Sequence, residues 1–503
     1  MQPDATAAAV AFLQRGIRMK ETARIVSAFG TPQIGGATPE EQAFLQRLVA
    51  VTPSPRQKAH ETLEYYSFLH FGMNTMTNRE WGTGDEPETL FAPATVDTDQ
   101  WCRVLKESGS RGVILTAKHH DGFCLWDTKT TTHSVMHSPY GKDVLRQLRE
   151  SCDKYGLRLG VYLSPWDRNA ACYGTEEYND FFVAQLTELC SNYGDLFEVW
   201  FDGACGEGPN GKKQRYDWRR YYSVIRALQP DAVIAISGPD VRWIGNEGGR
   251  VRESEWSVVG APAVLSDRVA AQSQQSETDL SFDRCEADLG SRDALQNETD
   301  LIWSPAEADV SVTTGWFYHG RGYYLFRKKR TAKQLVSIYF NTVGGNASLL
   351  LNVPPDKNGL LSNREQRTLR RVRQQIDDAF RTPLAPSLTL LSADGTAIDA
   401  QGLANGKTVL FPAGAFVLRL SFDHAEPVRT LVLGEDTAYS QRVERFSVWA
   451  EDAHGEVRKQ KSATVIGHKK ILRFSRPVRT KTLYVVIEQA RDVPALCLCN
   501  VWR

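Results

Sequence analysis

The chain lacks an excess of charge of either sign. Its 503 residues contain 60 lysines and arginines against 60 aspartates and glutamates, and the sequence pI is about 7.1. This balance leaves no basic footprint for DNA, RNA or an anionic membrane. The sequence also has no run of about 18 apolar residues, the length that a membrane-spanning helix needs. We therefore predict a neutral partner rather than nucleic acid or membrane.

Metal-binding and disulfide patterns are missing as well. The nine cysteines are scattered, and only Cys497 and Cys499 lie close together. This spacing excludes a zinc motif and a dense disulfide framework, so we predict mainly reduced, structural cysteines. The adjacent pair His119 and His120 does not indicate a metal site, because neighbouring residues on a strand point to opposite faces. We expect no metal ion.

The N-terminal residues lack the features of a secretory leader. Charged residues interrupt this region, among them Asp4, Arg15 and Lys20, and no uninterrupted apolar stretch precedes a cleavage pattern. The chain is therefore either cytoplasmic, or periplasmic or secreted after removal of a leader that precedes this numbering. The sequence carries no signal that sets its oligomeric state.

Several short apolar runs end on polar or aromatic side chains. The run 196–201 is followed by Asp202 and a glycine, and similar runs end within 66–72, 113–122 and 159–167. Continuous apolar runs are typical of buried parallel strands, and in α/β barrels chemistry collects at the carboxyl ends of such strands. Asp202 alone is equally well explained as a turn residue before glycine. The repeated pattern favours a functional site.

Amphipathic segments alternate with these strands and predict helices. Most of them stop just before glycine or proline, as helices do. Alternation of strands and helices predicts a parallel sheet, and a run of this length predicts a (β/α)8-type, TIM-like barrel. The expected helices are 97–107, 143–155, 176–193 and 216–228. Later strands are expected at 232–237, around Trp256, around 302–304 and at 348–353.

The sequence pattern divides the chain into three regions. Residues 1–50 are expected to form an N-terminal helical extension, which ends near the Pro53-Ser54-Pro55 break. Residues 51–382 are expected to form the catalytic barrel, closed by a charged helix at 363–380. From 383 to 503 the pattern changes to short alternating runs, which predict a β-sandwich.

A glycine-rich loop at 238–249 carries a second carboxylate, Glu247, close to Trp243. Two carboxyl groups flanking one bond are what glycoside cleavage needs, and a retaining enzyme holds them roughly 5 to 5.5 Å apart. We expect Asp202 to stay charged among hydrogen-bond donors and apolar surroundings to keep Glu247 protonated. By spacing alone three other carboxylates compete with Glu247 for this role: Asp240, Glu253 and Glu255.

Histidine and tryptophan side chains at the same strand ends are candidates for sugar binding. Neutral imidazole offers one donor and one acceptor, so His70, His119 and His120 suit sugar hydroxyls, although each is also explained as a core histidine. Glu80 beside Trp81 indicates a hydroxyl acceptor next to a stacking wall. Further apolar walls, or core residues, are Trp126, Trp166, Trp200 and Trp316.

Five motifs together resemble the retaining α-L-fucosidases of glycoside hydrolase family 29. They are HFGMNTMTNREWG at 70–82, KHHDGFCLW at 118–126, GVYLSPWDRN at 160–169, VWFDGACG at 199–206 and RWIGNEGG at 242–249. The resemblance covers about residues 50–380. The Gly245-Asn246-Glu247 loop, with segments 305–307 and 315–319, resembles the subfamily that prefers α-1,3/1,4-linked fucose on branched Lewis-type structures.

The resemblance implies a barrel followed by a sandwich that is loosely similar to carbohydrate-binding modules. It implies Asp202 as nucleophile and Glu247 as acid/base in an exo-acting double displacement without a cofactor. The implied partners are fucosylated oligosaccharides or glycoconjugates. The implied fucose contacts are His70, Glu80, Trp81, His119, His120, Tyr162, Trp166 and Trp200, and the implied contacts with +1 sugars are Glu307 and Trp316.

Two alternatives remain open at this point. One is a fucosidase of broad linkage preference that also cleaves α-1,2 and aryl fucosides. The other is a protein that binds fucose without cleaving it, which the presence of both carboxylates disfavours. A covalent intermediate also allows transfer of fucose to another sugar in place of water.

Overall fold

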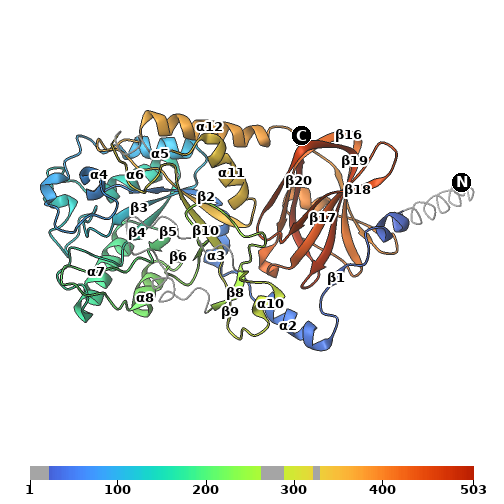
Figure 1. The fold of residues 1–503 in the computed structure, drawn as a ribbon, viewed down its shortest axis with the longest axis horizontal. Helices are drawn as coiled ribbons and strands as arrows, with labels where there is room; N and C mark the ends of the chain where they lie inside the picture. Colours follow the sequence, from blue (N-terminus) through green and yellow to red (C-terminus); the bar gives the residue numbers. More distant parts are fainter. Residues whose placement is uncertain (1–21, 262–287, 321–328) are drawn as a thin grey trace, which may run out of the picture.

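The computed structural model describes residues 22–261, 288–320 and 329–503. It contains a barrel with helices around it and a separate antiparallel β-module at the C-terminal end, shown in orange and red in Figure 1. This arrangement confirms the predicted barrel followed by a sandwich. Within the described ranges, no helix is long and apolar enough to cross a membrane.

The barrel is an eight-stranded parallel sheet in the described chain, with strand order β6-β5-β4-β3-β2-β11-β10-β7. A parallel bridge between Ala235 and Val241 brings β6 and β7 together and nearly closes the barrel. Most strand residues are buried, as expected where helices cover the outside. The strands are β2 (Tyr65–Leu69), β3 (Gly112–Lys118), β4 (Arg158–Leu163), β5 (Leu196–Phe201), β6 (Val233–Ile236), β7 (Arg242–Trp243), β10 (Ala306–Ser311) and β11 (Ala347–Asn352).

The helices predicted between the strands are confirmed. Four of them begin at an N-cap side chain that accepts a hydrogen bond from a first-turn backbone N–H. These N-cap residues are Asp97, Asp143, Asp217 and Ser362. The main helices are α5 (Thr98–Glu107), α6 (Val144–Tyr155), α7 (Glu176–Asn192), α8 (Trp218–Leu228), α11 (Ala332–Thr342) and α12 (Asn363–Ala379). Short elements are α3 (Pro55–Glu61), α4 (Met73–Thr77), η1 (Glu88–Leu90) and η2 (Val135–His137).

Two of the expected barrel strands are wrong. The segments around Trp256 and Ile302 form β8 (Val258–Gly260) and β9 (Leu301–Trp303), an antiparallel pair outside the barrel, with the short α10 (Arg292–Leu295) nearby. The barrel instead uses β7 and β10. Strand β10 has the sequence AEADVS, in which Glu307 and Asp309 interrupt the apolar run that marks a buried strand.

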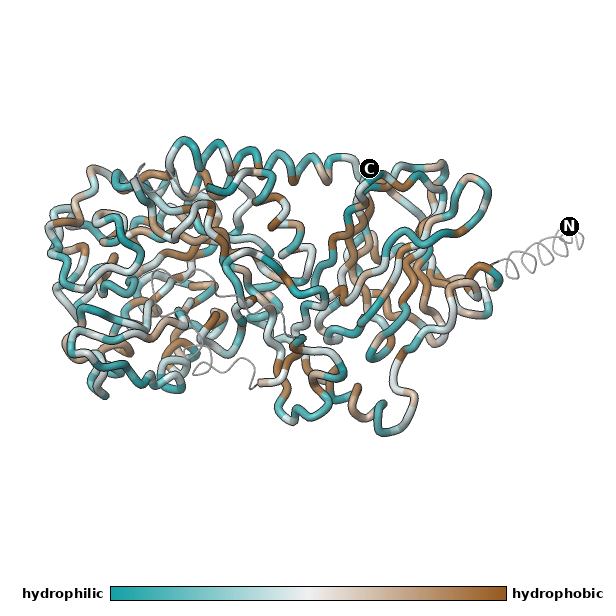
Figure 2. Tube along the Cα trace, in the orientation of Figure 1, coloured by the Kyte–Doolittle hydropathy of each residue, from teal (hydrophilic) through white to brown (hydrophobic). Residues whose placement is uncertain are grey.

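The C-terminal module is a ten-stranded antiparallel arrangement in the described residues, apart from the parallel strand β1. Its two long strands, β16 and β19, change register at several points, which lets them bend around an apolar core (Figure 2). The strands are β12 (Pro383–Leu384), β13 (Ser387–Ser392), β14 (Ala397–Asp399), β15 (Val409–Leu410), β16 (Ala415–Glu435), β17 (Val443–Glu451), β18 (Val457–Thr464), β19 (Lys470–Ala490) and β20 (Ala495–Trp502). Single-turn helices are η5 (Gln401–Asn405) and η6 (Thr437–Tyr439).

The N-terminal segment packs onto the C-terminal module. Residues 22–27 are helical, and the ring of Phe29 lies 5.2 Å from Trp449 and 5.4 Å from Tyr484. Strand β1 (Gln33–Ile34) pairs in parallel with the end of β19. Helix α2 (Pro39–Val49) packs its buried leucines against β8 and β9. Of the expected helical extension, residues 1–21 lie outside the described residues.

The sandwich contacts the amino ends of the barrel strands. Lys469 forms an ion pair with Glu64, just before β2, and the Thr437 hydroxyl donates to Glu61 at 2.9 Å. The backbone N–H of His468 donates to the Asn346 side chain, just before β11, at 2.7 Å. The carboxyl ends of the strands, where polar side chains gather, therefore face away from this junction.

All eight cysteines in the described part of the chain are free. Cys285 lies outside the described residues.

Candidate active site

Asp202 directly follows β5, and its carboxylate accepts hydrogen bonds from two donors. The Tyr162 hydroxyl donates to Oδ2 at 3.0 Å, and the backbone N–H of Ala204 donates to Oδ1 at 2.8 Å. The Nε2 atom of His120 lies 3.7 Å from Oδ2. The Asp202 side chain is 28% exposed, so a ligand in the cleft can reach it. These hydrogen bonds fix the carboxylate in place while leaving it accessible from the cleft.

Glu247 lies half-buried on the glycine-rich loop after β7. The Asn246 side chain accepts hydrogen bonds from Gly248 N and Arg250 N, and Arg330 donates to the Glu247 carbonyl oxygen at 3.2 Å, which together fix the loop. Burial, then the negative charge of Asp202, raise the pKa of Glu247 to about 7 against an opposing hydrogen bond from Trp316. A carboxyl with this pKa is poised to donate a proton and take it back near neutral pH.

The three carboxylates that competed with Glu247 have other positions. Asp240 is buried, accepts from the backbone N–H of Ile234 at 2.7 Å and pairs with Arg226. Glu255 is 1% exposed and is ion-paired with Arg242. Glu253 is exposed, near the sandwich, where its carbonyl oxygen accepts from a threonine hydroxyl. Glu247, by contrast, is close enough to Asp202 for the charge of Asp202 to raise its pKa.

The structure brings His70, His119 and His120 together beside Asp202. The rings of His119 and His120 are 4.0 Å apart, and those of His70 and His119 are 5.8 Å apart. Burial lowers the pKa of His70 to about 3 and that of His120 to about 4, and it holds the pKa of His119 well below its usual range. All three are therefore neutral at neutral pH, as sugar binding requires.

Neighbouring polar groups select the tautomers of His70 and His120. The Asn352 amide N–H groups donate to Trp316 O and Ser311 Oγ, so its Oδ1 accepts from His70 Nδ1 at 2.9 Å. The Ser164 hydroxyl donates to a carbonyl oxygen at 2.6 Å and thus accepts from His120 Nδ1 at 2.7 Å. Both histidines keep Nε2 as an acceptor for a ligand hydroxyl.

Aromatic walls flank these histidines. The rings of Trp81 and Trp166 meet edge to face at 5.2 Å, and Trp81 lies 5.8 Å from His120. Trp166 donates from Nε1 to the carbonyl oxygen of Glu207 at 3.0 Å and packs flat on Gly206, where any Cβ would lie 2.2 Å from the indole. The Gly206 backbone therefore fixes the orientation of Trp166.

Glu80 holds a loop in addition to lying near the site. Its Oε2 accepts from the backbone N–H of Trp316 at 2.8 Å, and its Oε1 pairs with His319. The indole of Trp316 lies 5.1 Å from the His70 ring, so this loop forms a wall of the cleft. The side chain of Glu80 is 16% exposed, which leaves limited room for a sugar hydroxyl.

Glu307 and Trp200 lie deeper than expected. Trp200 is 5% exposed, its ring stacks 5.3 Å from Tyr162, and its Nε1 donates to Glu307 Oε1 at 2.7 Å. Glu307 is 0% exposed, and its second oxygen accepts from Tyr66. Contact of Glu307 with a +1 sugar, as expected from the sequence, is therefore contradicted. Trp126 is likewise a core residue, with its Nε1 bonded to Glu188 at 2.8 Å.

Two groups of side chains in the described residues have the donor atoms for a metal ion. One is His119, His120 and Asp202, at the floor of the cleft. The other is His60, Glu198 and Glu307, inside the barrel, where the His60 Nε2 lies 2.9 Å from Glu198. Burial raises the pKa of Glu198 to about 8 and that of Glu307 well above its usual range, so protons can take the place of a cation in this second group.

Several supporting residues were not found by sequence reasoning. Lys118, the last residue of β3, is fully buried and pairs at 2.8 Å with Asp167, which lies in the segment after β4. Asp309 accepts from the Trp243 indole at 2.6 Å, and burial followed by the charge of Glu247 raises its pKa. Lys118 belongs to the motif KHHDGFCLW at 118–126, whereas Asp309 belongs to β10, a strand that the apolar pattern did not reveal.

Known proteins similar to the chain point to one family. Residues 56–377 match the family model described as Alpha-L-fucosidase. Alpha-L-fucosidase 1 of Arabidopsis thaliana is 36% identical over 467 residues, which cover 90% of this chain and 87% of that protein. A Bacteroides ovatus structure with a provisional alpha-L-fucosidase assignment is 40% identical, with a TM-score of 0.78, and the match covers 94% of this chain and 77% of that one. A glycoside hydrolase 29 family member from a rumen bacterium is 31% identical, with a TM-score of 0.73, over 90% and 77% of the two chains.

Proposed function

The chain belongs to the alpha-L-fucosidase family, glycoside hydrolase family 29, and we propose that it is an exo-acting retaining enzyme for α-1,3/1,4-fucosylated, Lewis-type glycans. As a member of this family it is an alpha-L-fucosidase, a hydrolase that acts on fucosylated glycans. The retaining mechanism, the roles of individual residues and the linkage preference are parts of the proposal. The observation that carries it is the pair Asp202 and Glu247, one bound by donors and the other protonated by its surroundings.

In the first step Asp202 attacks the anomeric carbon of L-fucose as the bond to the leaving oxygen breaks. Glu247 gives its proton to that oxygen, so the aglycone leaves as a neutral alcohol. The product is a β-fucosyl ester of Asp202. The raised pKa of Glu247 supports this role, because an acid must hold its proton at the pH at which the enzyme works.

In the second step Glu247, now ionised, takes a proton from water, and the resulting hydroxide attacks the anomeric carbon. The ester bond breaks, Asp202 regains its negative charge and Glu247 its proton, and L-fucose leaves with its α configuration retained. No cofactor takes part in either step. A sugar hydroxyl in place of water gives transfer of fucose instead.

Fucose itself is proposed to lie against the three neutral histidines. His70 and His120 offer Nε2 acceptors, and Asn74 donates to His119 Nδ1 at 3.3 Å, which leaves His119 Nε2–H as a donor. Trp81 and Trp166 supply apolar faces beside these groups. Tyr162 is proposed to act on Asp202 through its hydroxyl, and Trp200 to support Tyr162 from below.

The linkage preference rests on the wall formed by the segment that contains Trp316. Its backbone is held by Glu80 on one side and by Asn352, which donates to the Trp316 carbonyl oxygen at 2.7 Å, on the other. A fixed wall beside the sugar site favours a substrate whose neighbouring residues have one defined shape, as in a branched trisaccharide. A fucosidase of broad linkage preference is the second candidate, because the family membership and the pair Asp202 and Glu247 support it equally.

The test is fucose release from Lewis a or Lewis x trisaccharide, from 2′-fucosyllactose and from an aryl α-L-fucoside, each with the wild-type chain and with Asp202→Asn. Rapid release from the branched trisaccharide and much slower release from 2′-fucosyllactose supports the proposal. Equal release from all three supports broad preference. If the Asp202→Asn variant cleaves the aryl fucoside at a near-normal rate, the nucleophile assignment is wrong, and binding without release would indicate a fucose-binding protein.

A further inference from the structure

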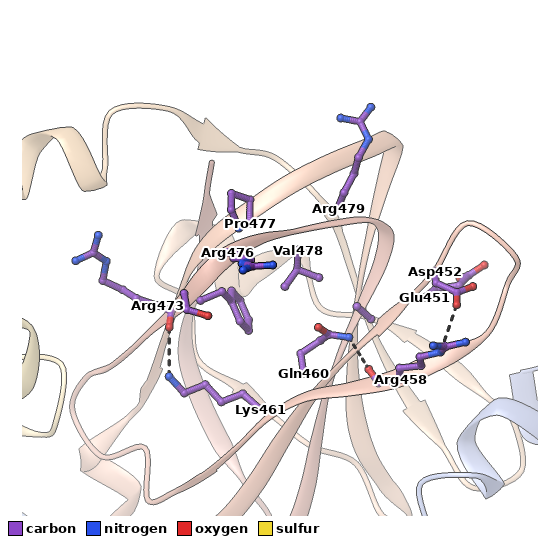
Figure 3. A pocket seen from close by; sticks show the side chains of 13 residues that line it. Glu451, Asp452, Arg458, Gln460, Lys461, Arg473, Arg476, Pro477, Val478 and Arg479 are labelled. Atoms are coloured by element: carbon purple, nitrogen blue, oxygen red, sulfur yellow. Dashed lines mark hydrogen bonds and ion pairs between the residues drawn. The ribbon is translucent and has the colours of Figure 1, made fainter.

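The C-terminal sandwich carries an open groove of about 600 Å³ on its surface. The groove lies where the end of β17, the strand β18 and the bent part of β19 meet, as seen in Figure 3. Two acidic side chains line it, Glu451 and Asp452. Against these stand five basic side chains: Arg458, Lys461, Arg473, Arg476 and Arg479. A chain with no net charge therefore concentrates positive charge at one place.

Most of this positive charge is not neutralised by the protein. Arg458 pairs with Asp452 at 3.4 Å. Lys461 donates to the carbonyl oxygen of Arg473 at 3.3 Å, which leaves its charge in place. Within the described ranges no carboxylate pairs with Arg473, Arg476 or Arg479, all of which are exposed. An anionic ligand would find at least three uncompensated cations here.

A bulge in β19 carries Arg476, and the paired residues Arg473 and Arg479 flank it. The ladder with β16 pairs Val428 with Val478 and Thr430 with Arg473, so residues 474–477 lie opposite the single residue Arg429. Such a bulge bends the strand and turns its side chains out of the regular ladder. Phe474 is 7% exposed and packs into the sandwich core, which anchors the bulge from inside. Arg476 therefore stands on an anchored bulge, and Arg473 and Arg479 stand on the paired strand residues beside it.

Arg429 on β16 adds a further positive charge close to Arg473. Burial and the neighbouring charge of Arg429 lower the pKa of Arg473. The Arg473 guanidinium also lies 4.4 Å from the ring centre of Phe340 on α11, so the charged end of this side chain rests against the barrel. A bound anion would relieve the repulsion between these like charges.

We propose that this groove is a binding site for anionic glycan, that is, for sugars that carry sulfate or carboxylate groups. Guanidinium groups bind such groups through paired N–H donors. Pro477 and Val478 supply an apolar surface beside the arginines for the face of a sugar ring, and the Gln460 side chain adds an amide (Figure 3). The groove would tether the enzyme to an acidic glycan while the barrel acts on fucose elsewhere.

The observations favour glycan over nucleic acid. Single-stranded nucleic acid is bound on exposed aromatic rings that stack with bases, and the one aromatic residue of the groove, Phe474, is buried. The volume of the groove suits a short oligosaccharide rather than a duplex. Because the sandwich meets the amino ends of the barrel strands, the groove and the catalytic cleft are separate sites. The inference requires neither the proposed linkage preference nor the residue roles in the barrel.

The test is calorimetric titration of the full chain with a chondroitin sulfate tetrasaccharide and with a hyaluronan tetrasaccharide, which carries carboxylates only. Chitotetraose serves as an uncharged probe, and a short single-stranded DNA as a different polyanion. We expect binding of the charged oligosaccharides at about 50 mM salt, weakening as salt rises. Arg476→Gln with Arg479→Gln should weaken binding by about tenfold or more, because two charge-assisted contacts are lost.

The matched control is the pair Arg364→Gln and Arg371→Gln, which removes two exposed arginines from α12. It should leave binding unchanged, and all variants should keep wild-type turnover of an aryl fucoside and an unchanged melting temperature. The proposal is overturned if the wild-type chain binds no charged oligosaccharide or if the control pair loses as much affinity. It is also overturned if the DNA binds more tightly than the glycans, which would indicate a nucleic-acid site. Turnover of the aryl fucoside measures the activity of the barrel alone. Failure of the proposed glycan site can therefore be distinguished from failure of the proposed catalytic function.

Discussion

Tyr162 donates a hydrogen bond of 3.0 Å to Asp202 across the ends of two neighbouring strands. The ring of Tyr162 stacks on Trp200, which in turn donates to the buried Glu307. The carboxylate proposed as nucleophile is thus connected, through two aromatic rings, to a polar cluster inside the barrel. Packing of this cluster sets the position of Tyr162 and so of its hydroxyl.

Replacement of Tyr162 by phenylalanine is expected to keep the fold and the stacking on Trp200 but to remove the donor to Asp202. Hydrogen bonds to charged groups contribute about 1.5–3 kcal/mol, so kcat/KM for an aryl fucoside should fall about 10- to 100-fold. Steady-state kinetics measure the loss, and the melting temperature should change little. A variant with wild-type kcat/KM would show that the hydroxyl has no role in the reaction.

The pKa of Glu247 is expected to depend on Asp202. The charge of Asp202 is one cause of the raised value of about 7, so Asp202→Asn should lower the pKa of Glu247. Because the proposed first step needs protonated Glu247, kcat/KM of the wild-type enzyme should fall as pH rises above about 7. NMR titration of carboxyl-labelled protein gives the pKa in both forms. An unchanged value in the variant would contradict the coupling between the two groups.

Glu247→Gln should affect substrates according to their leaving groups. Natural glycosides need a proton on the departing oxygen, whereas an aryl oxygen leaves more readily without one. Loss of activity should therefore be far larger on a Lewis trisaccharide than on an aryl fucoside, and azide should partly restore cleavage of the latter. Equal losses on both substrates would argue against the acid role.

The buried carboxyl group of Glu198 should make stability depend on pH. Burial raises its pKa to about 8 in the folded state from the usual 4.5. Its contribution is therefore fully present below about pH 4.5 and is lost as pH rises towards 8. The melting temperature of Glu198→Gln should fall less steeply between pH 5 and 8 than that of the wild type, whereas the exposed control Glu150→Gln should follow the wild type. If the melting temperatures of all three proteins show the same dependence on pH, ionisation of Glu198 does not affect the stability of the fold.

The ion pair between Lys118 and Asp167 is expected to support the histidine pair that follows Lys118. Lys118→Met leaves a buried carboxylate without its cation, which should lower the free energy of unfolding by about 3–5 kcal/mol. Lys129 offers a matched control, because it pairs with Asp127 while its side chain is 77% exposed. Lys129→Met should change stability by less than about 1 kcal/mol in the same urea titration. If both substitutions lower the free energy of unfolding by the same amount, the buried pair has no special role in stability.

Much of the barrel and its cleft could be predicted from the sequence. Parallel strands are buried on both faces, so their apolar runs stand out, and the polar residue after each run marks the cleft, as with His70, His119 and Asp202. The strand β10 could not be predicted, because Glu307 and Asp309 interrupt its apolar run. These carboxyl groups fit inside the barrel only through bonds to Tyr66, Trp200 and Trp243, which are distant in sequence.

The role of Glu80 illustrates the same limit. A glutamate beside a tryptophan indicates a ligand contact, and Glu80 does lie near the cleft. Its bonds to Trp316 and His319 depend on a loop that comes from the other side of the barrel. Such long-range pairing leaves no local pattern in the sequence, and this applies equally to the contact of Phe29 with Trp449.

Pairing of β1 with β19 also has a consequence for the order in which the chain can fold. Residues 33 and 34 leave the ribosome long before their partners, 489 and 490, have been made. In the finished protein Val26 and Phe29 pack against β17 and β19. These two side chains therefore stay exposed to solvent while the whole barrel is synthesised. Apolar segments that stay exposed during synthesis are where chains aggregate or recruit chaperones. Release of the finished chain, rather than completion of the barrel, is the event that allows the N-terminal segment to reach its place.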